Sequence, residues 1–456
     1  MLTLWITAAL ANPNPPADHV ASELLGRALT SDTAYEELRT LCYDYGARLS
    51  GTEVLERAID WAAEELRKDG LTVHKEEVLV PSWQRGEETA RILTPENRRI
   101  EALGLGASVS TPPEGLEAEV IVVDSFDHFD RLSRRDVKGK FVLWDIPFTT
   151  YGETVQYRSK GAAVAAKKGA LASLIRSVSP YSLYTPHTGN QHDKDGDPPI
   201  PAMALTLEDA TSIRAWTEAG TPVRMSLQME SHRGEPSVSH NVIADIPGRE
   251  RPEEIVLLSC HIDSWDVGHG AHDDGAGCTM VMDAARLIAE RPVAPKRTVR
   301  VVLFTNEENG LSGGTHYAKH HADERHVAVL EADAGGGDPL GFNVDIRRAD
   351  ERARARDLTS ALEALAPISQ LLEPIQATHL GPGGSGADIS PLVDATGVLG
   401  LGLRNDMSLY WHIHHTRADT FDKIDPAAMR KNVAAVTVAA WMLAEMDTLP
   451  WEGAAP

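Results

Sequence analysis

Cysteine is scarce in this chain. Only three occur among its 456 residues, Cys42, Cys260 and Cys278. An odd number of cysteines without clustered spacing does not indicate a disulfide framework. Cys260 precedes His261, but we interpret it as a small buried residue of a strand rather than as a metal ligand. A chain of this length exceeds a typical single hydrophobic core, so we expect two domains.

Positive charge is also in short supply. The chain has 44 Lys and Arg residues against 67 Asp and Glu residues, which gives a formal net charge of −23 at pH 7. A surface of that sign repels phosphate backbones, so the composition argues against nucleic acid as a partner. The hydrophobic content of 42% and charged content of 24% are ordinary for a folded soluble protein.

Long apolar runs are missing too. No stretch of about 20 apolar residues follows the N-terminus, so no membrane-spanning helix is expected. The first residues do form a short apolar run that ends in Ala9-Leu10-Ala11, a pattern typical of signal-peptide cleavage, although no Lys or Arg precedes it. We interpret residues 1–20 as a candidate signal segment and leader and expect an exported protein, periplasmic or extracellular. A disordered start is the alternative.

Two kinds of segment make up the rest of the chain. From about residue 239, unbroken apolar strands alternate with helices, which is typical of a sheet covered on both faces. Residues 96–234 instead contain short β-like runs, an alanine-rich helix and a loop rich in Pro and Gly. We predict an α/β fold with a mixed, mostly parallel sheet and helices on both faces, formed by residues 21–95 and 235–456. Residues 96–234 would be a β-rich inserted domain, whose ends can lie close together.

Histidine and acidic side chains follow the predicted strands at their carboxyl ends. The strands are expected at residues 255–259, 299–305, 327–330 and 398–403. His261 follows the first, Glu307 and Glu308 the second, Asp333 the third, and a loop with His415 the fourth. In open α/β sheets, ligands bind outside the carboxyl ends of the strands. We therefore expect four separate segments to bring these side chains to one edge of the sheet.

His261 and Asp273 are candidate metal ligands. A neutral imidazole ligand needs its second N–H fixed by an acceptor, and Asp263, two residues further on, is a suitable one. Asp273 and Asp274 precede Gly275, and helix capping would explain one of these carboxylates but not both. A carboxylate can bridge two cations about 3.5–4 Å apart. We predict that Asp273 is the bridge and that Asp274 orients the backbone.

Glu307 and Glu308 are adjacent at a strand end, so their side chains point in different directions. One can bind a cation while the other faces the attacking water. We predict Glu308 as the ligand and Glu307 as the general base, which passes a proton to the leaving amine. Asp333 follows apolar residues, where an acid is costly unless it is paired or metal-bound. The loop after the fourth strand holds three histidines, and the residues alone leave open which is the ligand. The other nearby histidines are interpreted as loop or surface residues: His187, His192, His269 and His272.

The motif region resembles a known enzyme family. Residues 261–268 read His-Ile-Asp-Ser-Trp-Asp-Val-Gly and are followed by Gly270-Ala271 and Asp273-Asp274. This pattern, with the glutamate pair, resembles the two-zinc exopeptidases, which include bacterial aminopeptidases and glutamate carboxypeptidases. It is most similar to their carboxypeptidase Q subgroup. The resemblance runs from about Thr33 through the C-terminal helix and implies the zinc exopeptidase fold, peptide hydrolysis and two zinc ions per chain.

The resemblance assigns a role to each candidate. The implied ligand sets share one acid: His261, Asp273 and Asp333 for one zinc, and Asp273, Glu308 and His415 for the other. His415 is selected because the family's last histidine precedes a Thr/Ser-x-x-Asp-Thr stretch, here residues 416–420. Glu307 matches the catalytic base of the family, and Asp263 matches the acid that supports the first histidine.

The resemblance extends to the surroundings of the site. Relatives often have a cis peptide that would fall at Asp273–Asp274, a rare arrangement without proline. The insertion resembles a protease-associated domain, with residues 137–142 as its recognisable piece. Residues 383–389 replace a Ser-Asp-His stretch of many relatives, which leaves Tyr410 and Asp388 as candidates for substrate contact. Members of this subgroup are exported and commonly dimeric, which implies a homodimer.

The predicted function is a co-catalytic dizinc metallo-exopeptidase that hydrolyses dipeptides or short peptides. A single-zinc acyl transferase of the glutaminyl cyclase type is one alternative, and it needs only three ligands. A metal-free, non-catalytic peptide-binding ectodomain is the other, and it would tolerate loss of the ligands. All five ligand positions are present, which favours the first reading.

Overall fold

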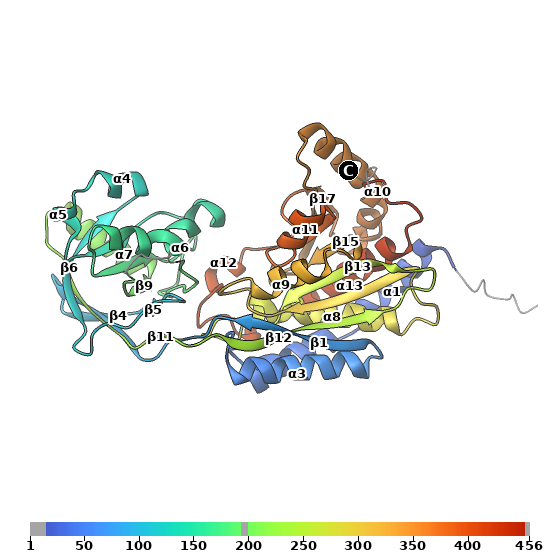
Figure 1. Cartoon of the computed structure of the whole chain (residues 1–456), viewed down its shortest axis with the longest axis horizontal. Coiled ribbons are helices and arrows are strands. Elements are labelled where there is room, and N and C mark those ends of the chain that lie inside the picture. The colour runs from blue at the N-terminus through green and yellow to red at the C-terminus, as the bar shows by residue number, and fades with distance from the viewer. Residues whose placement is uncertain (1–14, 193–198, 452–456) are drawn as a thin grey trace, which may run out of the picture.

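The computed structural model describes residues 15–192 and 199–451. They form two lobes (Figure 1), a larger one at the right of the view and a smaller one at the left. Residues 1–14 of the predicted signal segment lie outside the described residues, and the first helix, α1, spans Ala17–Ala28. Among the described residues, no helix combines the length and apolar character needed to cross a membrane.

The larger lobe is built on an eight-stranded mixed sheet. In spatial order its strands are β1 (Thr72–Val80), β12 (Ser237–Ile246), β14 (Arg297–Phe304), β13 (Arg251–His261), β15 (Arg325–Glu331), β18 (Leu399–Asn405), β16 (Pro339–Asp345) and β17 (His379–Pro382). The four central strands, β14, β13, β15 and β18, are parallel, whereas β12 and β16 run antiparallel to the central strand beside them. This confirms the predicted α/β class with a mixed sheet.

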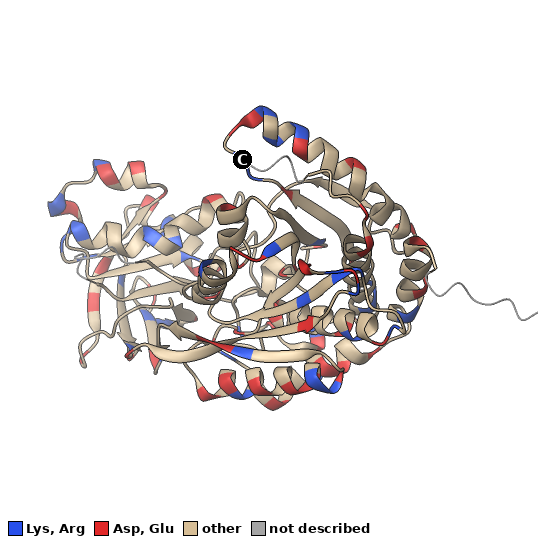
Figure 2. Ribbon diagram, turned by 45° about the vertical axis from the view of Figure 1, so that its right-hand side comes forward, with Lys and Arg blue, Asp and Glu red and all other residues tan. Residues whose placement is uncertain are grey.

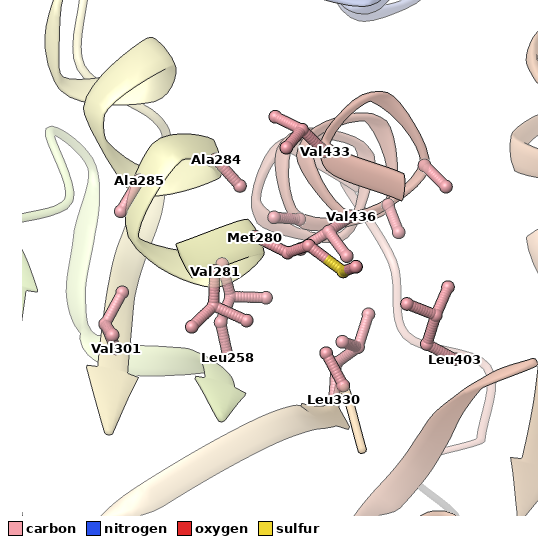
Figure 3. Packing of buried hydrophobic residues seen from close by; sticks show 14 of the residues in the cluster. Leu258, Met280, Val281, Ala284, Ala285, Val301, Leu330, Leu403, Val433 and Val436 are labelled. Carbon is pink, nitrogen blue, oxygen red and sulfur yellow. The ribbon is translucent and has the colours of Figure 1, made fainter. Parts of the chain in front are cut away.

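Helices cover both faces of this sheet, as predicted. One face packs against α1, α2 (Thr33–Thr40), α3 (Glu53–Lys68), α8 (Ala276–Ala289), α10 (Glu351–Leu371) and α13 (Pro426–Glu445), and the other against α9 (Ser312–His321) and α11 (Ser390–Thr396). Side chains of β13 alternate between them: Val256 and Leu258 enter the first core, Ile255 and Leu257 the second. Figure 3 shows Leu258 next to Met280 of α8 in the first core. The central strands are therefore buried on both faces, which explains their unbroken apolar sequences.

Helix α3 illustrates how the local sequence specifies an element. The Thr52 side chain caps it by accepting a hydrogen bond from the backbone N–H of Leu55. Leu55, Ile59, Ala62 and Leu66 recur at helical spacing and are buried against the sheet. The opposite face carries the acidic residues that are coloured red along this helix in Figure 2. Each fully buried leucine or isoleucine contributes about 1.5–3 kcal/mol.

The smaller lobe contains a second eight-stranded sheet. In spatial order its strands are β4 (Arg98–Ile100), β3 (Glu88–Thr94), β10 (Arg224–Met229), β6 (Leu116–Val123), β7 (Phe141–Trp144), β8 (Ala172–Arg176), β9 (Ala202–Leu205) and β5 (Ala102–Gly104). β6, β7, β8 and β9 are parallel. The helices of this lobe are α4 (Phe126–Arg131), α5 (Arg134–Val137), α6 (Tyr151–Lys167) and α7 (Leu207–Glu218). The segment is thus an α/β unit with four helices, not only a β-rich one.

A two-stranded ribbon lies at the connections between the lobes. It pairs β2 (Trp83–Gln84) with β11 (His232–Arg233). β3, which follows β2 directly, already belongs to the sheet of the smaller lobe. We therefore place the ends of the insertion near residues 85 and 231, whereas the sequence alone suggested 96 and 234. Short elements complete the chain: the π-helical turns η1 (Leu41–Tyr45) and η2 (Ala271–Gly275), the 3-10 turns η3 (Glu373–Ile375) and η4 (Phe421–Lys423), and α12 (Tyr410–Ile413).

Arg48, on the turn before α3, fixes the long loop that follows β13. Its side chain is fully buried. The guanidinium donates hydrogen bonds to the backbone oxygens of Gly46, Ile262, His269 and Gly270 at 2.7–3.0 Å. One side chain therefore holds both ends of the loop between His261 and Asp273, two of the predicted ligands.

The role of Arg48 can be tested by replacing it with methionine. Arg48→Met keeps the length of the side chain but removes four hydrogen bonds and leaves the carbonyl groups of Gly46, Ile262 and His269 without this donor, so we expect a loss of at least about 2 kcal/mol in the free energy of unfolding. Urea unfolding followed by circular dichroism measures this loss. Arg39→Met, at an exposed arginine of α2, serves as the control, and equal stability of the two variants would contradict the assignment.

Candidate metal centre

The five predicted ligands meet at the carboxyl ends of β13, β14 and β15. His261 Nε2 lies 3.3 Å from Asp273 Oδ1 and 3.7 Å from Asp333 Oδ1. His415 Nε2 lies 3.2 Å from the second oxygen of Asp273, Oδ2, and 3.0 Å from Glu308 Oε2. Asp273 therefore faces one ligand set with each of its oxygens, which is the arrangement expected of a bridging carboxylate.

The donor atoms fit a pair of divalent cations. His261 Nε2, Asp273 Oδ2 and Glu308 Oε1 are buried and have no hydrogen-bond partner among the described residues. Buried polar atoms are normally hydrogen-bonded, so such orphans call for a ligand. Two imidazoles and three carboxylates form a mixed nitrogen and oxygen set that suits zinc and several other divalent ions. His261, Asp273 and Asp333 would hold one cation, and Asp273, Glu308 and His415 the other.

Several buried acidic side chains lie close together at this site, and this shifts their pKa values. Burial, followed by repulsion from Asp273, raises the pKa of Glu308 to about 7. Burial also raises the pKa of Glu307 well above its usual value, although His261 opposes the shift. Burial alone would raise the pKa of Asp273, but ion pairs with His261 and His415 hold it well below its usual range. Like charges this close are stabilised by cations, which lower carboxylate pKa values.

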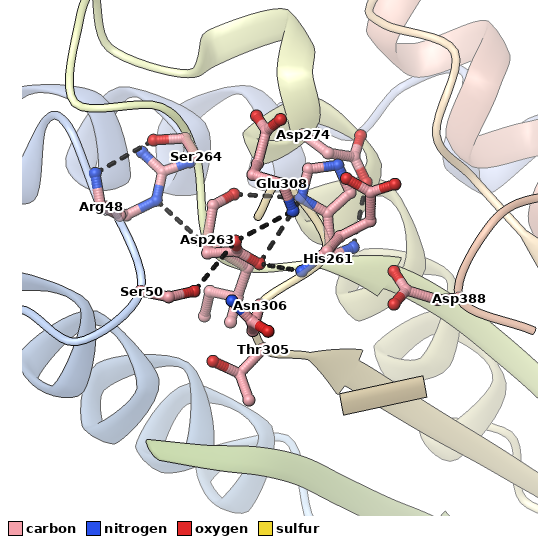
Figure 4. A network of polar contacts seen from close by, with 12 residues as sticks. Arg48, Ser50, His261, Asp263, Ser264, Asp274, Thr305, Asn306, Glu308 and Asp388 are labelled. Atoms are coloured by element: carbon pink, nitrogen blue, oxygen red, sulfur yellow. Dashed lines mark hydrogen bonds and ion pairs between the residues drawn. The ribbon is translucent and has the colours of Figure 1, made fainter. Parts of the chain in front are cut away.

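Asp263 has a different task from the expected one. His261 Nδ1 donates its proton to the backbone oxygen of Asp263 at 3.1 Å, whereas the nearer carboxylate oxygen is 3.8 Å away. The carboxylate instead accepts hydrogen bonds from the backbone N–H groups of Glu307 at 3.0 Å and Glu308 at 3.3 Å, and from Ser50 Oγ at 3.2 Å. Figure 4 shows Asp263 with Ser50 and Glu308 in this network, and all three side chains are buried. The main chain of Asp263 orients the histidine, and its side chain positions the glutamate pair.

The backbone around the bridging acid is held by two further carboxylates. Asp274 accepts from the backbone N–H groups of His261 and Gly277, so it orients the main chain as predicted. Asp419 accepts from the N–H groups of His272 and Asp273 at 2.8 and 3.1 Å. The peptide bond between Asp273 and Asp274 is cis, which confirms the expectation from the resemblance.

A cavity of about 460 Å³ opens beside the candidate ligands. Asp273, Glu307, Glu308 and Asp333 line it from the larger lobe, together with Tyr410. The smaller lobe supplies the other wall, which consists of Tyr151, Val155, Arg158, Ser159, Asn190 and His192. Glu307, the candidate base, therefore faces a space that is large enough for a short peptide.

Of the two candidates for substrate contact, Tyr410 lines this cavity and Asp388 does not. Tyr410 is buried on the cavity wall. Asp388 is 1% exposed, and neither of its carboxylate oxygens has a hydrogen-bond partner among the described residues. Burial raises its pKa, and so does repulsion from Glu331. Glu331 itself accepts from the backbone N–H groups of Asp388 and Ile389, so the two acids are packed together behind Asp333.

The histidines near the site differ in part from the predictions. His415 contacts both Asp273 and Glu308, whereas His414 reaches only Asp273, at 3.5 Å, and its ring stacks on His415. His187, expected at the surface, is buried, and its Nδ1 donates to the backbone oxygen of His414 at 2.7 Å. His192 lines the cavity. His192 is nevertheless exposed, as predicted. The error at His187 arises because the insertion folds back onto the larger lobe, and no local sequence pattern records that contact.

The number and spacing of the cysteines did not indicate a disulfide framework, but the structure contains one disulfide. Cys260 and Cys278 form a disulfide with a Cα–Cα distance of 5.1 Å, and Cys42 is buried and free. Cys260 precedes His261 at the end of β13, and Cys278 lies in the first turn of α8. The strand end and the helix start meet below the site, although 18 residues separate them. Because the number of cysteines is odd, it did not indicate this pair.

The contribution of Asp263 to the centre can be measured through metal affinity. An asparagine has one acceptor oxygen in place of two, so Asp263→Asn should release one of the glutamate N–H groups and loosen Glu308. We expect the affinity for zinc to fall about 10–100-fold in calorimetric titration. Asp422→Asn, at an exposed acid, is the control. An unchanged affinity would mean that the backbone of the glutamate pair is fixed without Asp263.

The similarity to known proteins extends over most of the chain and is not confined to the motif. A sequence model described as Peptidase family M28 matches residues 241–440. Carboxypeptidase Q of Homo sapiens is 41% identical over 419 residues, which cover 91% of this chain and 86% of that protein. The same protein of Mus musculus is 40% identical with the same coverage.

Solved structures agree with the sequence relatives. A Peptidase M28 precursor from Shewanella amazonensis SB2B is 35% identical and superposes with a TM-score of 0.89, covering 95% of this chain and 97% of its own. An aminopeptidase from Aneurinibacillus sp. strain AM-1, at 20% identity, shares the fold with a TM-score of 0.66 over 94% of this chain and 97% of its own. The chain therefore belongs to peptidase family M28, and carboxypeptidase Q is among its sequence relatives.

Proposed function

We propose that this protein is a co-catalytic dizinc metallo-exopeptidase that hydrolyses dipeptides or short peptides. The observation that carries the proposal is the convergence of five metal-ligand side chains and Glu307 on one cavity. A structural metal site would be closed, whereas a catalytic one needs an open face and a base beside it. The similarity to carboxypeptidase Q and to zinc aminopeptidases points to the same chemistry.

The residues divide the work of amide hydrolysis between them. Two bound zinc ions would supply Lewis-acid polarisation of the scissile carbonyl and activation of water. Glu307 accepts the proton of the attacking water and donates it to the departing amine. Asp263 keeps Glu307 in place through its backbone N–H. Tyr410, which lines the cavity, would contact the substrate, whereas Asp388 donates its backbone N–H to Glu331 and does not line the cavity.

A buried arginine suggests which end of the peptide is recognised. Arg158 of α6 is 7% exposed, and no carboxylate of the described residues lies within ion-pair distance of it. Nη1 donates to Thr188 O at 3.3 Å, Nη2 donates to Tyr151 Oη at 3.1 Å, and Nε has no partner. A buried cation without a counter-charge is costly, so the cavity favours an anionic group of the substrate. The terminal carboxylate is the one anion that every unmodified short peptide carries.

The position of Arg158 fits the release of one C-terminal residue. Its Nη1 lies 3.4 Å from His415 Nδ1, on the opposite side of that ring from the Nε2 that contacts Glu308. Consecutive residues of a peptide are about 3.8 Å apart, so one residue spans the gap between a scissile carbonyl at the ligands and a carboxylate at Arg158. Gly189 makes room, because a Cβ there would collide with the guanidinium. We therefore favour dipeptidase or carboxypeptidase action over aminopeptidase action.

The rival functions make different predictions about metal content and products. A single-zinc acyl transferase of the glutaminyl cyclase type would bind one ion per chain and form pyroglutamyl products. A non-catalytic ectodomain would bind peptides in the presence of chelator. Retention of both ligand sets and of Glu307 weighs against both rivals. Export stays a prediction, supported by the disulfide, which is typical of oxidising compartments. Homodimer formation also stays a prediction.

The first test concerns the general base. Glu307→Gln keeps the size of the side chain but removes its ability to accept a proton. We expect kcat for dipeptides to fall by about 10²–10⁴-fold, while the chain still binds two zinc ions by elemental analysis. Glu250→Gln, at an exposed acid of the larger lobe, should leave both quantities unchanged. Unchanged turnover in Glu307→Gln would overturn the assignment of the base.

The second test concerns the terminal carboxylate. Arg158→Met should raise KM for dipeptides about 10–100-fold, because a charge-assisted hydrogen bond is lost, and should change kcat little. The same substitution should leave the slow hydrolysis of the corresponding dipeptide amides unchanged. Arg134→Met, at an exposed arginine of the insertion, is the matched control. Equal losses on the free acids and the amides would refute carboxylate recognition without refuting peptide hydrolysis.

A further inference from the structure

A second cluster of metal-ligand side chains lies on the outside of the larger lobe. Helix α9 carries His316, His320 and His321, and the edge strand β1 carries Glu76. His316 and His320 are one helical turn apart, so their rings lie on the same side of the helix. α9 packs against β1, which brings Glu76 beneath them. None of these residues belongs to the metal centre described above.

The donor atoms of this cluster are close enough to share one ion. One ligand atom each of Glu76, His316 and His320 lies within 4.8 Å of the other two. His316 Nε2 is 3.6 Å from Glu76 Oε1, and His321 Nε2 is 3.1 Å from the same oxygen. The rings of His316 and His320 stack with their centroids 4.0 Å apart. A small movement of two partly exposed rings would bring the nitrogens to coordination distance of about 2.0–2.1 Å.

Hydrogen bonds leave the right atoms free for coordination. His320 Nδ1 donates to the backbone oxygen of His316 at 2.8 Å, which fixes the tautomer and leaves the lone pair on Nε2. Glu76 Oε2 is buried and has no hydrogen-bond partner among the described residues. An oriented imidazole and an orphan carboxylate oxygen are also the features that mark the centre at His261.

We propose that Glu76, His316 and His320 form a third binding site for a divalent transition-metal ion, with His321 as an available fourth ligand. Imidazole nitrogens select zinc, copper or nickel over magnesium and calcium, and a single carboxylate completes a tetrahedral zinc site. The ion joins α9 to the edge strand of the sheet. Because α9 begins four residues after Glu308, the ion also braces the helix behind the glutamate pair.

An ion pair without metal is the competing explanation for the cluster. His321 contacts Glu76 through Nε2 and Glu324 through Nδ1 at 3.2 Å, so it can bridge two acids as a charged imidazole. That pair accounts for Glu76 and His321. It gives no reason for the stacked pair of His316 and His320, or for the unpartnered oxygen of Glu76.

Metal counting distinguishes the two explanations. The protein is dialysed against buffered zinc chloride, and the zinc per chain is measured by elemental analysis. We expect three ions in the wild type and two in His320→Ala and in Glu76→Gln, with dipeptide hydrolysis unchanged. His19→Ala, at an exposed histidine of α1, should retain three. Circular dichroism confirms that each variant is folded.

Copper provides a second readout at the same residues. Electron paramagnetic resonance of copper-loaded protein should show one nitrogen-coordinated signal that is present in His321→Ala and lost in the double variant His316→Ala/His320→Ala. Equal zinc counts in all proteins, or a third ion that persists without His316 and His320, would overturn the proposal. The difference of one ion between wild type and variant is independent of whether the protein hydrolyses peptides, so the outcome does not depend on the proposed function.

Discussion

Buried negative charge is the constraint that shapes the larger lobe. Asp273, Glu308 and Asp333 come from three different segments and meet where little water can screen them, with Glu307 and Asp263 beside them. Like charges at such distances repel strongly in a medium of low dielectric. Positive charge between the carboxylates would relieve this repulsion, and neutral imidazole ligands would coordinate cations without adding a charge of their own. The fold therefore brings these carboxylates together at a site that favours the binding of cations.

The scaffold around this charge is made largely of main-chain hydrogen bonds. Arg48 holds the loop after β13 through three carbonyl groups, and Asp263 holds the glutamate pair through two N–H groups. Asp419 does the same for the bridging acid. Each of these carboxylate and guanidinium groups mainly orients backbone groups. These hydrogen bonds therefore fix the positions of ligands that lie on loops, which are usually positioned less precisely than helices and strands.

The smaller lobe forms one wall of the cavity. His187 bonds to the backbone beside His415, and Arg158 reaches the same histidine from α6. Arg158 lies on the same face of α6 as the buried residues Ala162 and Ala165. In the sequence, the one indication of its role was therefore an arginine at helical spacing from buried alanines. Its meaning depends on which surface that stripe faces, and this is set only when the lobes pack together.

The sequence by itself determined the α/β class, the strands that end at the candidate ligands, four of the five candidate ligand positions and the glutamate pair, whereas His415 was selected by the family resemblance. These follow from apolar runs and from the residues that end them, both of which are local. It assigned no element to residues 339–382, where β16, α10 and β17 lie, because the hydrophobic periodicity of α10 is weak and β16 and β17 contain Pro and Gly. Tertiary structure alone decided the disulfide, the true partners of Asp263, the limits of the insertion and the second wall of the cavity. Each of these joins residues distant in sequence, and the interaction energy between them appears only once the chain has brought them into contact.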